Sequence, residues 1–91
     1  MNIEIIWENI KLHEGEIFST ARGIEYTYVV VKDYILVNDD KKRKITKNSI
    51  KTAVAINDVS PSEIQREGIW GPSYVYGIIT DKRICLKEGD S

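Results

Sequence analysis

The chain has 91 residues, of which 42% are hydrophobic and 30% are charged, and its net charge is −1 at neutral pH. This length suits one folded unit with a modest core, and the apolar content is too high for a wholly disordered chain. No apolar run approaches the roughly 20 residues of a membrane span, and the single cysteine, Cys85, excludes an intrachain disulfide. The opening residues lack the features of a signal peptide, so we expect one compact cytoplasmic domain over 1–91 with a frayed tail at 88–91.

Charge is unevenly distributed along the chain. Residues 1–20 contain four Glu and one Lys, whereas Lys41 to Lys51 contains six Lys or Arg and no acid. This split predicts a dipolar molecule if the two segments lie on different faces. It is typical of a protein with an acidic partner or of one that self-associates, and equally of an ordinary solvated surface.

The first ten residues fit two patterns. Ile3 and Ile5 alternate as in a strand, whereas Ile3, Ile6, Trp7 and Ile10 fit one face of a helix. Periodicity alone leaves both alternatives open.

From residue 16 onward, the pattern predicts an antiparallel meander. Residues 16–20 can pair with 24–31 through a hairpin loop in which Gly23 supplies a positive φ. Turn signals then separate a strand at 34–38 from a short strand near 43–45. Three or four antiparallel strands are therefore expected.

A central helix is predicted over 46–57. Thr46 is a good N-cap whose hydroxyl can accept a hydrogen bond from the amide of Ser49. Ile45 and Ile50 occupy the two positions of a hydrophobic staple, which fixes how the chain enters the helix.

The remainder of the chain is less clear. A long connection follows the central helix, with one helical turn expected at 62–66. Residues 72–87 fit either a helix that begins at Pro72 or a hairpin that turns at 81–82, and we favour the helix. Together these elements predict an α+β fold, with a meander sheet, one central helix and a C-terminal helix or hairpin.

The basic stretch is the first candidate binding site. Lysines at a helix N-terminus oppose the helix dipole, so stability does not explain them, although lysine on an exposed turn also favours solubility. The free amides of the first helical turn, with hydroxyls and lysines nearby, would suit a phosphate or another anion. We therefore hypothesise a non-enzymatic module that binds nucleic acid or an acidic protein, mainly through phosphate or carboxylate contacts. The residues are Lys41, Lys42, Arg43, Lys44, Thr46, Lys47, Ser49 and Lys51.

Aromatic residues gather around a second candidate site. Trp70, Tyr74 and Tyr76 flank a Gly-Pro turn, and Trp and Tyr dominate the contacts that contribute most to protein interfaces. The alternative hypothesis is therefore a homo-oligomeric or protein-docking module. Packing of Trp70 on the core beside Trp7 is the competing interpretation.

Signals for catalysis are weak. His13 is the only histidine, and Cys85 has no histidine at a recognisable spacing. No phosphate-binding glycine motif is present. We expect no catalytic residue, cofactor or metal, a surface position for His13, and a buried Cys85 that packs as a small hydrophobe.

Three phrases together resemble a group of small uncharacterised bacterial proteins. They are Phe18-x-Thr20-x-x-Gly23-x-x-Tyr26-x-Tyr28, Ile45-Thr46-Lys47-x-x-Ile50-x-x-Ala53 and Gly71-Pro72-Ser73-Tyr74. The resemblance implies a compact bacterial domain and carries no known activity. Separately, residues 79–84 are similar to a strand-turn-strand phrase of bacterial PH-like domains.

Overall fold

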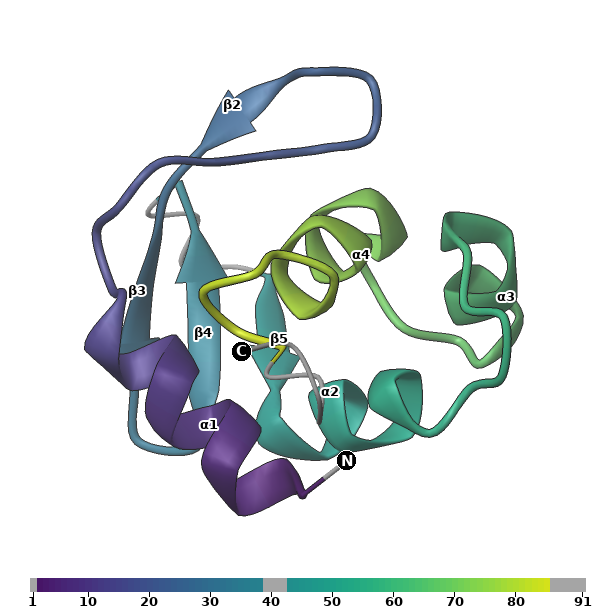
Figure 1. Ribbon diagram of the computed structural model, residues 1–91, viewed down its shortest axis with the longest axis horizontal. Coiled ribbons are helices and arrows are strands. Elements are labelled where there is room, and N and C mark those ends of the chain that lie inside the picture. Colours follow the sequence, from purple (N-terminus) through teal and green to yellow (C-terminus); the bar gives the residue numbers. More distant parts are fainter. Residues whose placement is uncertain (1, 39–42, 86–91) are drawn as a thin grey trace.

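Helices and strands are mixed along the chain in an α+β arrangement, as predicted (Figure 1). The computed structural model describes residues 2–38 and 43–85, so Lys41, Lys42 and the tail at 88–91 lie outside the described residues. In chain order the elements are α1 (Ile3–Leu12), β1 (Phe18–Ser19), β2 (Glu25–Tyr26), β3 (Tyr28–Val31), β4 (Tyr34–Val37), β5 (Lys44–Thr46), α2 (Lys47–Val54), α3 (Pro61–Arg66) and α4 (Pro72–Ile79).

The N-terminal segment forms α1, so the strand alternative is wrong. Asn2 caps the helix by accepting a hydrogen bond from the amide of Glu4. The apolar residues at helical spacing, Ile6, Trp7 and Ile10, are buried in the core, whereas Ile5 is half exposed. Burial of this stripe stabilises the helix, because a short isolated helix is marginal in water.

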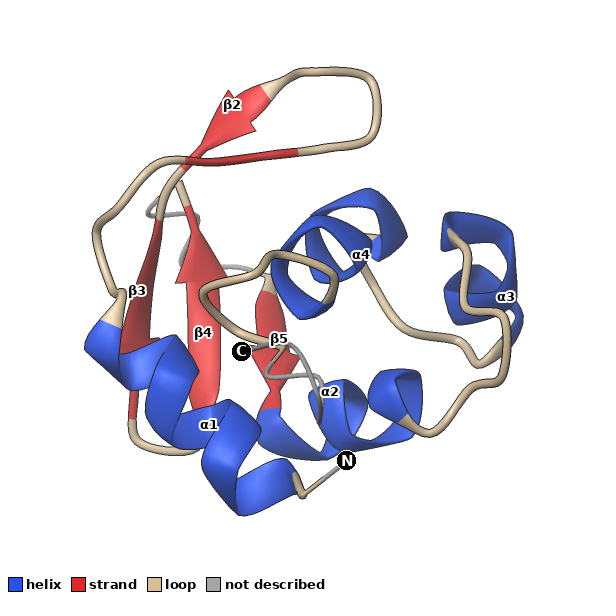
Figure 2. Ribbon diagram, viewed as in Figure 1, coloured by secondary structure: helices blue, strands red, loops and turns tan. Residues whose placement is uncertain are grey.

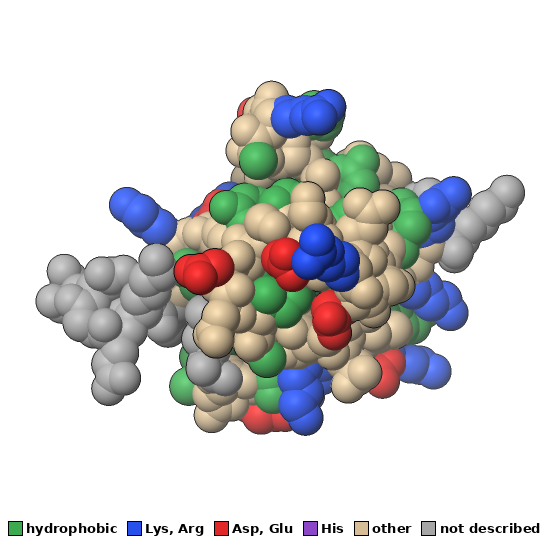
Figure 3. Space-filling model, turned by 90° about the vertical axis from the view of Figure 1, so that its right-hand side faces the viewer, with side chains coloured by type: hydrophobic (Ala, Val, Ile, Leu, Met, Phe, Trp, Pro, Cys, Tyr) green, Lys and Arg blue, Asp and Glu red, His purple; other side chains and the backbone are tan. Residues whose placement is uncertain are grey.

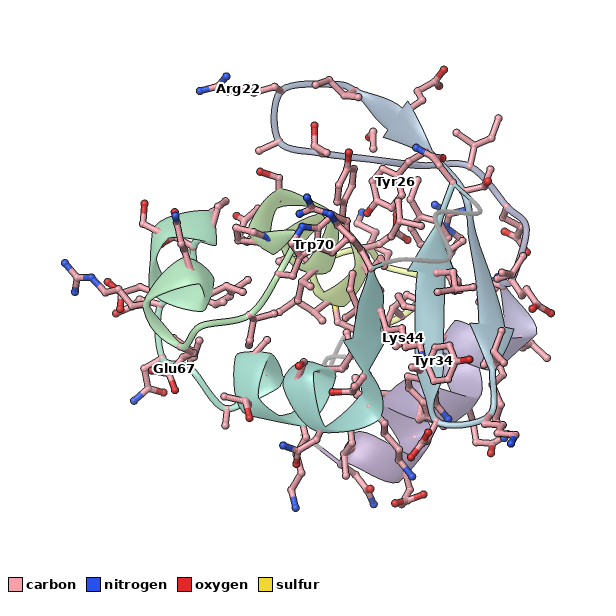
Figure 4. All side chains as sticks on the ribbon, turned by 180° about the vertical axis from the view of Figure 1, so that it is seen from behind. Arg22, Tyr26, Tyr34, Lys44, Glu67 and Trp70 are labelled. Carbon is pink, nitrogen blue, oxygen red and sulfur yellow. The ribbon has the colours of Figure 1, made fainter. Side chains whose placement is uncertain are left out.

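Three strands form the predicted meander, in the order β3-β4-β5, with each pair antiparallel. The register places Ile35 opposite both Val30 and Ile45; Ile35 and Ile45 are buried in the core, and the partly buried Val30 packs against it. Helix α1 lies in front of this sheet in the view of Figure 2. The other side, seen in Figure 4, carries Tyr34 and Lys44.

The expected strand over 24–31 is interrupted at Thr27, so the prediction of one continuous strand is wrong. Thr27 exchanges hydrogen bonds with Asn38, whose φ of 52° ends β4. The residues before Thr27 therefore leave the meander and form β2, which pairs with β1 in a separate two-stranded sheet. This hairpin stands apart from the meander in Figure 1.

The later part of the chain is helical. Thr46 caps α2 as predicted, but α2 ends at Val54 rather than at residue 57. The C-terminal alternative is decided in favour of the helix, because α4 begins at Pro72 and buries Val75, Ile78 and Ile79 on one face. Turns follow it, so residues 79–84 do not form the strand-turn-strand unit suggested by the second resemblance.

Gly77 brings α4 unusually close to the hairpin. A Cβ atom at this position would lie 2.6 Å from the carbonyl oxygen of Ser19 and 2.6 Å from the hydroxyl oxygen of Tyr26. Only glycine permits this approach, so α4 can pack this closely against β1 because residue 77 has no Cβ atom.

Over residues 2–38 and 43–85, no helix has both the length and the apolar character needed to cross a membrane.

Candidate binding site

Five aromatic rings form a continuous row from the core to the surface, which we call the aromatic row. Tyr28 and Phe18 have ring centroids 5.2 Å apart, and Phe18 and Tyr26 are 6.3 Å apart. Tyr26 and Tyr74 meet edge to face at 5.0 Å, and Tyr74 lies 5.9 Å from Trp70. These separations are typical of favourable aromatic contacts. The row therefore joins the hairpin, β3 and α4.

Two hydroxyl groups fix the aromatic row to the backbone. Tyr28 donates to the carbonyl of Ile10 at 2.6 Å, and Tyr26 donates to the carbonyl of Tyr74 at 2.8 Å. Burial raises the pKa of both phenols above their ordinary value. Both remain neutral donors at physiological pH, so the rings are held in place.

In the inner part of the row, the guanidinium of Arg83 lies 3.8 Å from the centre of the Phe18 ring. It makes two hydrogen bonds of 2.9 Å to Asp81, one of 3.1 Å to Glu16 and one of 2.9 Å to the carbonyl of Ile17. The hydrogen bonds from Arg83 lower the pKa of Asp81. The pKa of Glu16 is lowered mainly by its hydrogen bond with His13 and, to a smaller extent, by its hydrogen bond with Arg83. Arg83 thus links the end of the described chain to the loop after α1.

At the Trp70 end of the row, the guanidinium of Arg43 lies 5.2 Å from the centre of the Trp70 ring. Arg43 is exposed, and no carboxylate of the described residues lies within ion-pair distance of it. A cation over an indole face is favourable, by roughly 0.5–1 kcal/mol at an exposed site.

A cavity of about 660 Å³ lies beside Trp70, between the hairpin loop, α3 and the start of α4. We call it the aromatic groove. Its described lining residues are Thr20, Ala21, Arg22, Ile24, Pro61, Gln65, Ile69, Trp70, Gly71, Pro72, Ser73 and Tyr74. Figure 3 looks onto the side with α3, where apolar side chains lie beneath the hairpin and a cationic side chain marks its tip.

Charge in the aromatic groove is positive. Arg22 is the one charged side chain among its described lining residues. Arg43 is not one of them, but its guanidinium lies over the ring of Trp70, which is. In Figure 4, Arg22 marks the hairpin tip and Trp70 lies below it, close to α4. The start of α4 adds a partial positive charge, since Gly71 provides no side-chain cap and its first turn has no acid.

The described cations of the basic stretch are dispersed rather than gathered. Arg43 lies over Trp70, a lining residue of the aromatic groove, whereas the ammonium of Lys44 lies 4.6 Å from the centre of the Tyr34 ring on the other side of the sheet. Lys47 binds both carboxylate oxygens of Glu4 at 3.1 Å. Lys51 shares a shallow hollow of about 250 Å³ with Lys47, Ile3, Glu4, Asp33 and Asn48.

The hydroxyls predicted to bind an anion at α2 already serve the helix. The Thr46 hydroxyl accepts from the amide of Ser49 and donates to the Ser49 hydroxyl, both at 3.0 Å. The first turn of α2 is therefore capped from within, and Glu4 lies next to it.

The aromatic candidates divide in the structure. All three are half-buried and pack against the core, as the competing interpretation of Trp70 expected, but only Trp70 and Tyr74 also line the aromatic groove. Sequence reasoning missed the opposite wall, including Arg22 and Ile24. The sequence of a hairpin loop does not indicate that it will face a segment about forty residues later. The one available signal was an isoleucine, Ile24, placed directly after the loop glycine Gly23.

The residues weighed for catalysis have structural surroundings. Cys85 is buried, as predicted. Nδ1 of His13 lies 2.9 Å from Oε2 of Glu16. Among the residues that the structure describes, no group of three potential metal ligands comes together.

Fold and site together define a small α+β domain with a positively charged aromatic groove. Comparison of the chain with protein-family models, with curated proteins and with solved structures returned no match. The resemblance to a group of small bacterial proteins stays a prediction.

Proposed function

We propose that this protein is a small non-enzymatic docking module that binds a segment of a partner protein in the aromatic groove. The observation that carries the proposal is the placement of Trp70 and Tyr74, which line a cavity of about 660 Å³ and are held there by the aromatic row. A volume of this size and an apolar lining with few polar groups are typical of ligand sites. Rigid aromatic side chains supply contact area at low entropic cost.

A protein segment suits the groove better than a nucleic acid. A protein that binds the phosphates of a nucleic acid needs several cations on one surface. Here Arg43, Lys44 and Lys47 lie at three separate places. Aliphatic and proline side chains, including Ile24, Pro61 and Pro72, line the groove beside its two aromatic rings, and Arg22 is the one cation among its described lining residues. Such a lining accepts apolar side chains but offers few phosphate contacts.

Selection from a phage-displayed library of random twelve-residue peptides tests this function. We expect wild-type protein to enrich peptides that bind poorly to Trp70→Ala and to Ile24→Asp. Ile24 is 59% exposed, so its substitution leaves the core intact, and Ile17, also 59% exposed but outside the groove, gives a matched control in Ile17→Asp.

Three outcomes overturn the proposal. The first is a selection that enriches nothing, and the second is a set of peptides that binds Ile24→Asp as well as wild type. The third is binding of twelve-residue oligo-dT or oligo-rU that Trp70→Ala abolishes, which would restore the nucleic-acid hypothesis for the same surface.

A second copy of this chain is one candidate partner. Light scattering at increasing protein concentration tests it, because a homo-oligomer dissociates on dilution. We place the docking function in the bacterial cytoplasm, where a single reduced cysteine is usual.

A further inference from the structure

We infer that the partner segment in the aromatic groove is acidic and apolar, with a carboxylate bound by Arg43 or Arg22 and an aliphatic or aromatic side chain against Trp70. This inference rests on the proposed docking function and specifies the chemistry of its partner.

The first argument is the state of Arg43. Arg83, which lies over Phe18 in the inner part of the aromatic row, makes four hydrogen bonds to two carboxylates and a carbonyl. Arg43 lies on an aromatic ring in the same way, but it has no carboxylate partner among the described residues. A guanidinium on a ring face keeps its N–H edges available, and a carboxylate binds those edges with two parallel hydrogen bonds. Arg43 can therefore bind a carboxylate of a ligand in the way that Arg83 binds Asp81 and Glu16.

The second argument is the position of the acids around the groove. On α3, Glu63 pairs with Arg66 at 3.2 Å, and neither lines the cavity. Glu67, just after α3, lies far from Trp70 and points away from it in Figure 4. Glu25 on β2 is exposed and does not line the cavity either. No described carboxylate therefore competes for the groove, and a ligand acid would meet uncompensated positive charge.

The third argument is the apolar surface that remains open. Ile24 is 59% exposed at the groove, although its neighbours in the cavity are mostly apolar. A large side chain with this exposure gains free energy when a ligand covers it, at roughly 25 cal/mol for each Å² of apolar surface removed from water. A purely polar anion such as phosphate would leave this surface wet, so the ligand must carry apolar groups as well as acids.

Replacing the arginines at the groove with glutamate tests whether the partner segment must be acidic, separately from whether any segment docks there. The same phage-displayed library is selected against wild type, Arg43→Glu and the double variant Arg22→Glu with Arg43→Glu. We expect wild type to enrich peptides with Asp or Glu next to large apolar residues, and the double variant to enrich Lys or Arg at those positions. The best wild-type peptide, synthesised with a fluorescent label, should lose ~10-fold in affinity for Arg43→Glu.

Two other cations provide matched controls for the charge change. Lys51→Glu alters the same basic stretch away from the groove, and Arg66→Glu alters α3 without touching the cavity. Both should bind the labelled peptide within about twofold of wild type, because exposed charges at this distance are screened by salt. Circular dichroism of each variant confirms that the fold is retained.

The outcomes distinguish the two claims. Enriched peptides that depend on Trp70 and Ile24 but lack acids, or that bind Arg43→Glu as well as wild type, would overturn the acidic partner and leave the docking function intact. No enrichment at all would overturn both. Equal loss of affinity with Lys51→Glu and Arg43→Glu would show diffuse electrostatics, and would overturn the specific carboxylate site.

Discussion

Two arginines each lie over a ring of the aromatic row, yet their surroundings differ. Arg83 covers Phe18 at 3.8 Å and is fully engaged with Asp81, Glu16 and a backbone carbonyl. Arg43 covers Trp70 at 5.2 Å and meets no carboxylate of the described residues. The first arginine therefore stabilises the fold, whereas the second is suited to a ligand.

The same contrast applies within the basic stretch. Lys47 lies in the segment with the highest density of positive charge, but Glu4 from α1 neutralises it at 3.1 Å. Arg43, four residues earlier, lies instead over Trp70, which lines the aromatic groove. Charge density along the chain is thus a poor guide to a binding site, because the partners from distant segments decide which cations remain available.

The largest expected effect comes from Gly77→Ala, which would break the support of the aromatic row. Alanine in a helix usually stabilises by up to about 1 kcal/mol relative to glycine. Here the added Cβ would clash with Ser19 and Tyr26 at 2.6 Å, so we expect a loss of about 3 kcal/mol in the free energy of unfolding. Urea denaturation measures it.

Gly68→Ala is the control for this change. Gly68 has a φ of +77° and nothing within 4 Å of a built Cβ, so only backbone strain of about 1 kcal/mol is expected. A Gly77→Ala variant as stable as wild type would show that α4 does not depend on this close approach.

The next effect compares the two arginines directly. Arg83→Met should lower the free energy of unfolding by about 1–2 kcal/mol, because it leaves a partly buried Asp81 without its two hydrogen bonds from the guanidinium, although the backbone amide of residue 83 still donates to it. Arg43→Met should cost only a few tenths of a kcal/mol, since one exposed cation–π contact is lost. Urea titrations of both variants test the difference, and equal losses would remove the distinction between a structural and an available arginine.

Acid pH should sharpen the same comparison. The pKa of Asp81 is lowered in the folded state, mainly by its hydrogen bonds with Arg83. Its contribution is complete above the unfolded pKa of about 3.9 and is lost as the pH falls toward the lower folded pKa. Wild type and Arg43→Met should therefore lose stability below about pH 4, and Arg83→Met should lose less. Unfolding titrations between pH 2 and pH 6 measure this, and identical pH profiles would contradict it.

The smallest effect is expected for Glu4→Gln. The ion pair with Lys47 is mostly exposed, so its loss should change the free energy of unfolding by about 0.5 kcal/mol or less. Lys11→Gln, which removes the exposed pair with Glu8, is a matched control. A loss well above that of the control would mean that this pair fixes α1 to α2.

Local signals predicted several elements correctly. Thr46 caps α2, Gly23 forms the hairpin loop with a φ of +85°, and Pro72 begins α4. Each depends on the chemistry of a few neighbouring residues. The break at Thr27 could not be predicted, because it follows from hydrogen bonds with Asn38, eleven residues further along.

The candidate site was only half visible in the sequence. Trp70 and Tyr74 were recognised because aromatic residues cluster beside a turn, and Arg43 because it belongs to a basic stretch. Their meeting, and the hairpin wall with Arg22 and Ile24, depend on where α4 packs. Tyr76 was included because it is close in sequence, but the helix turns it toward the core.

By itself, the sequence determined the α+β class, the N-cap of α2, the start of α4 at Pro72 and the burial of Cys85, since these follow from local propensity and from the number of apolar residues. Tertiary structure alone decided which charges are neutralised and where a groove opens. The physical reason is the separation along the sequence of the groups that interact. The cap joins Thr46 to a residue three positions away, whereas Arg43 and Lys47 contact side chains 27 and 43 residues away.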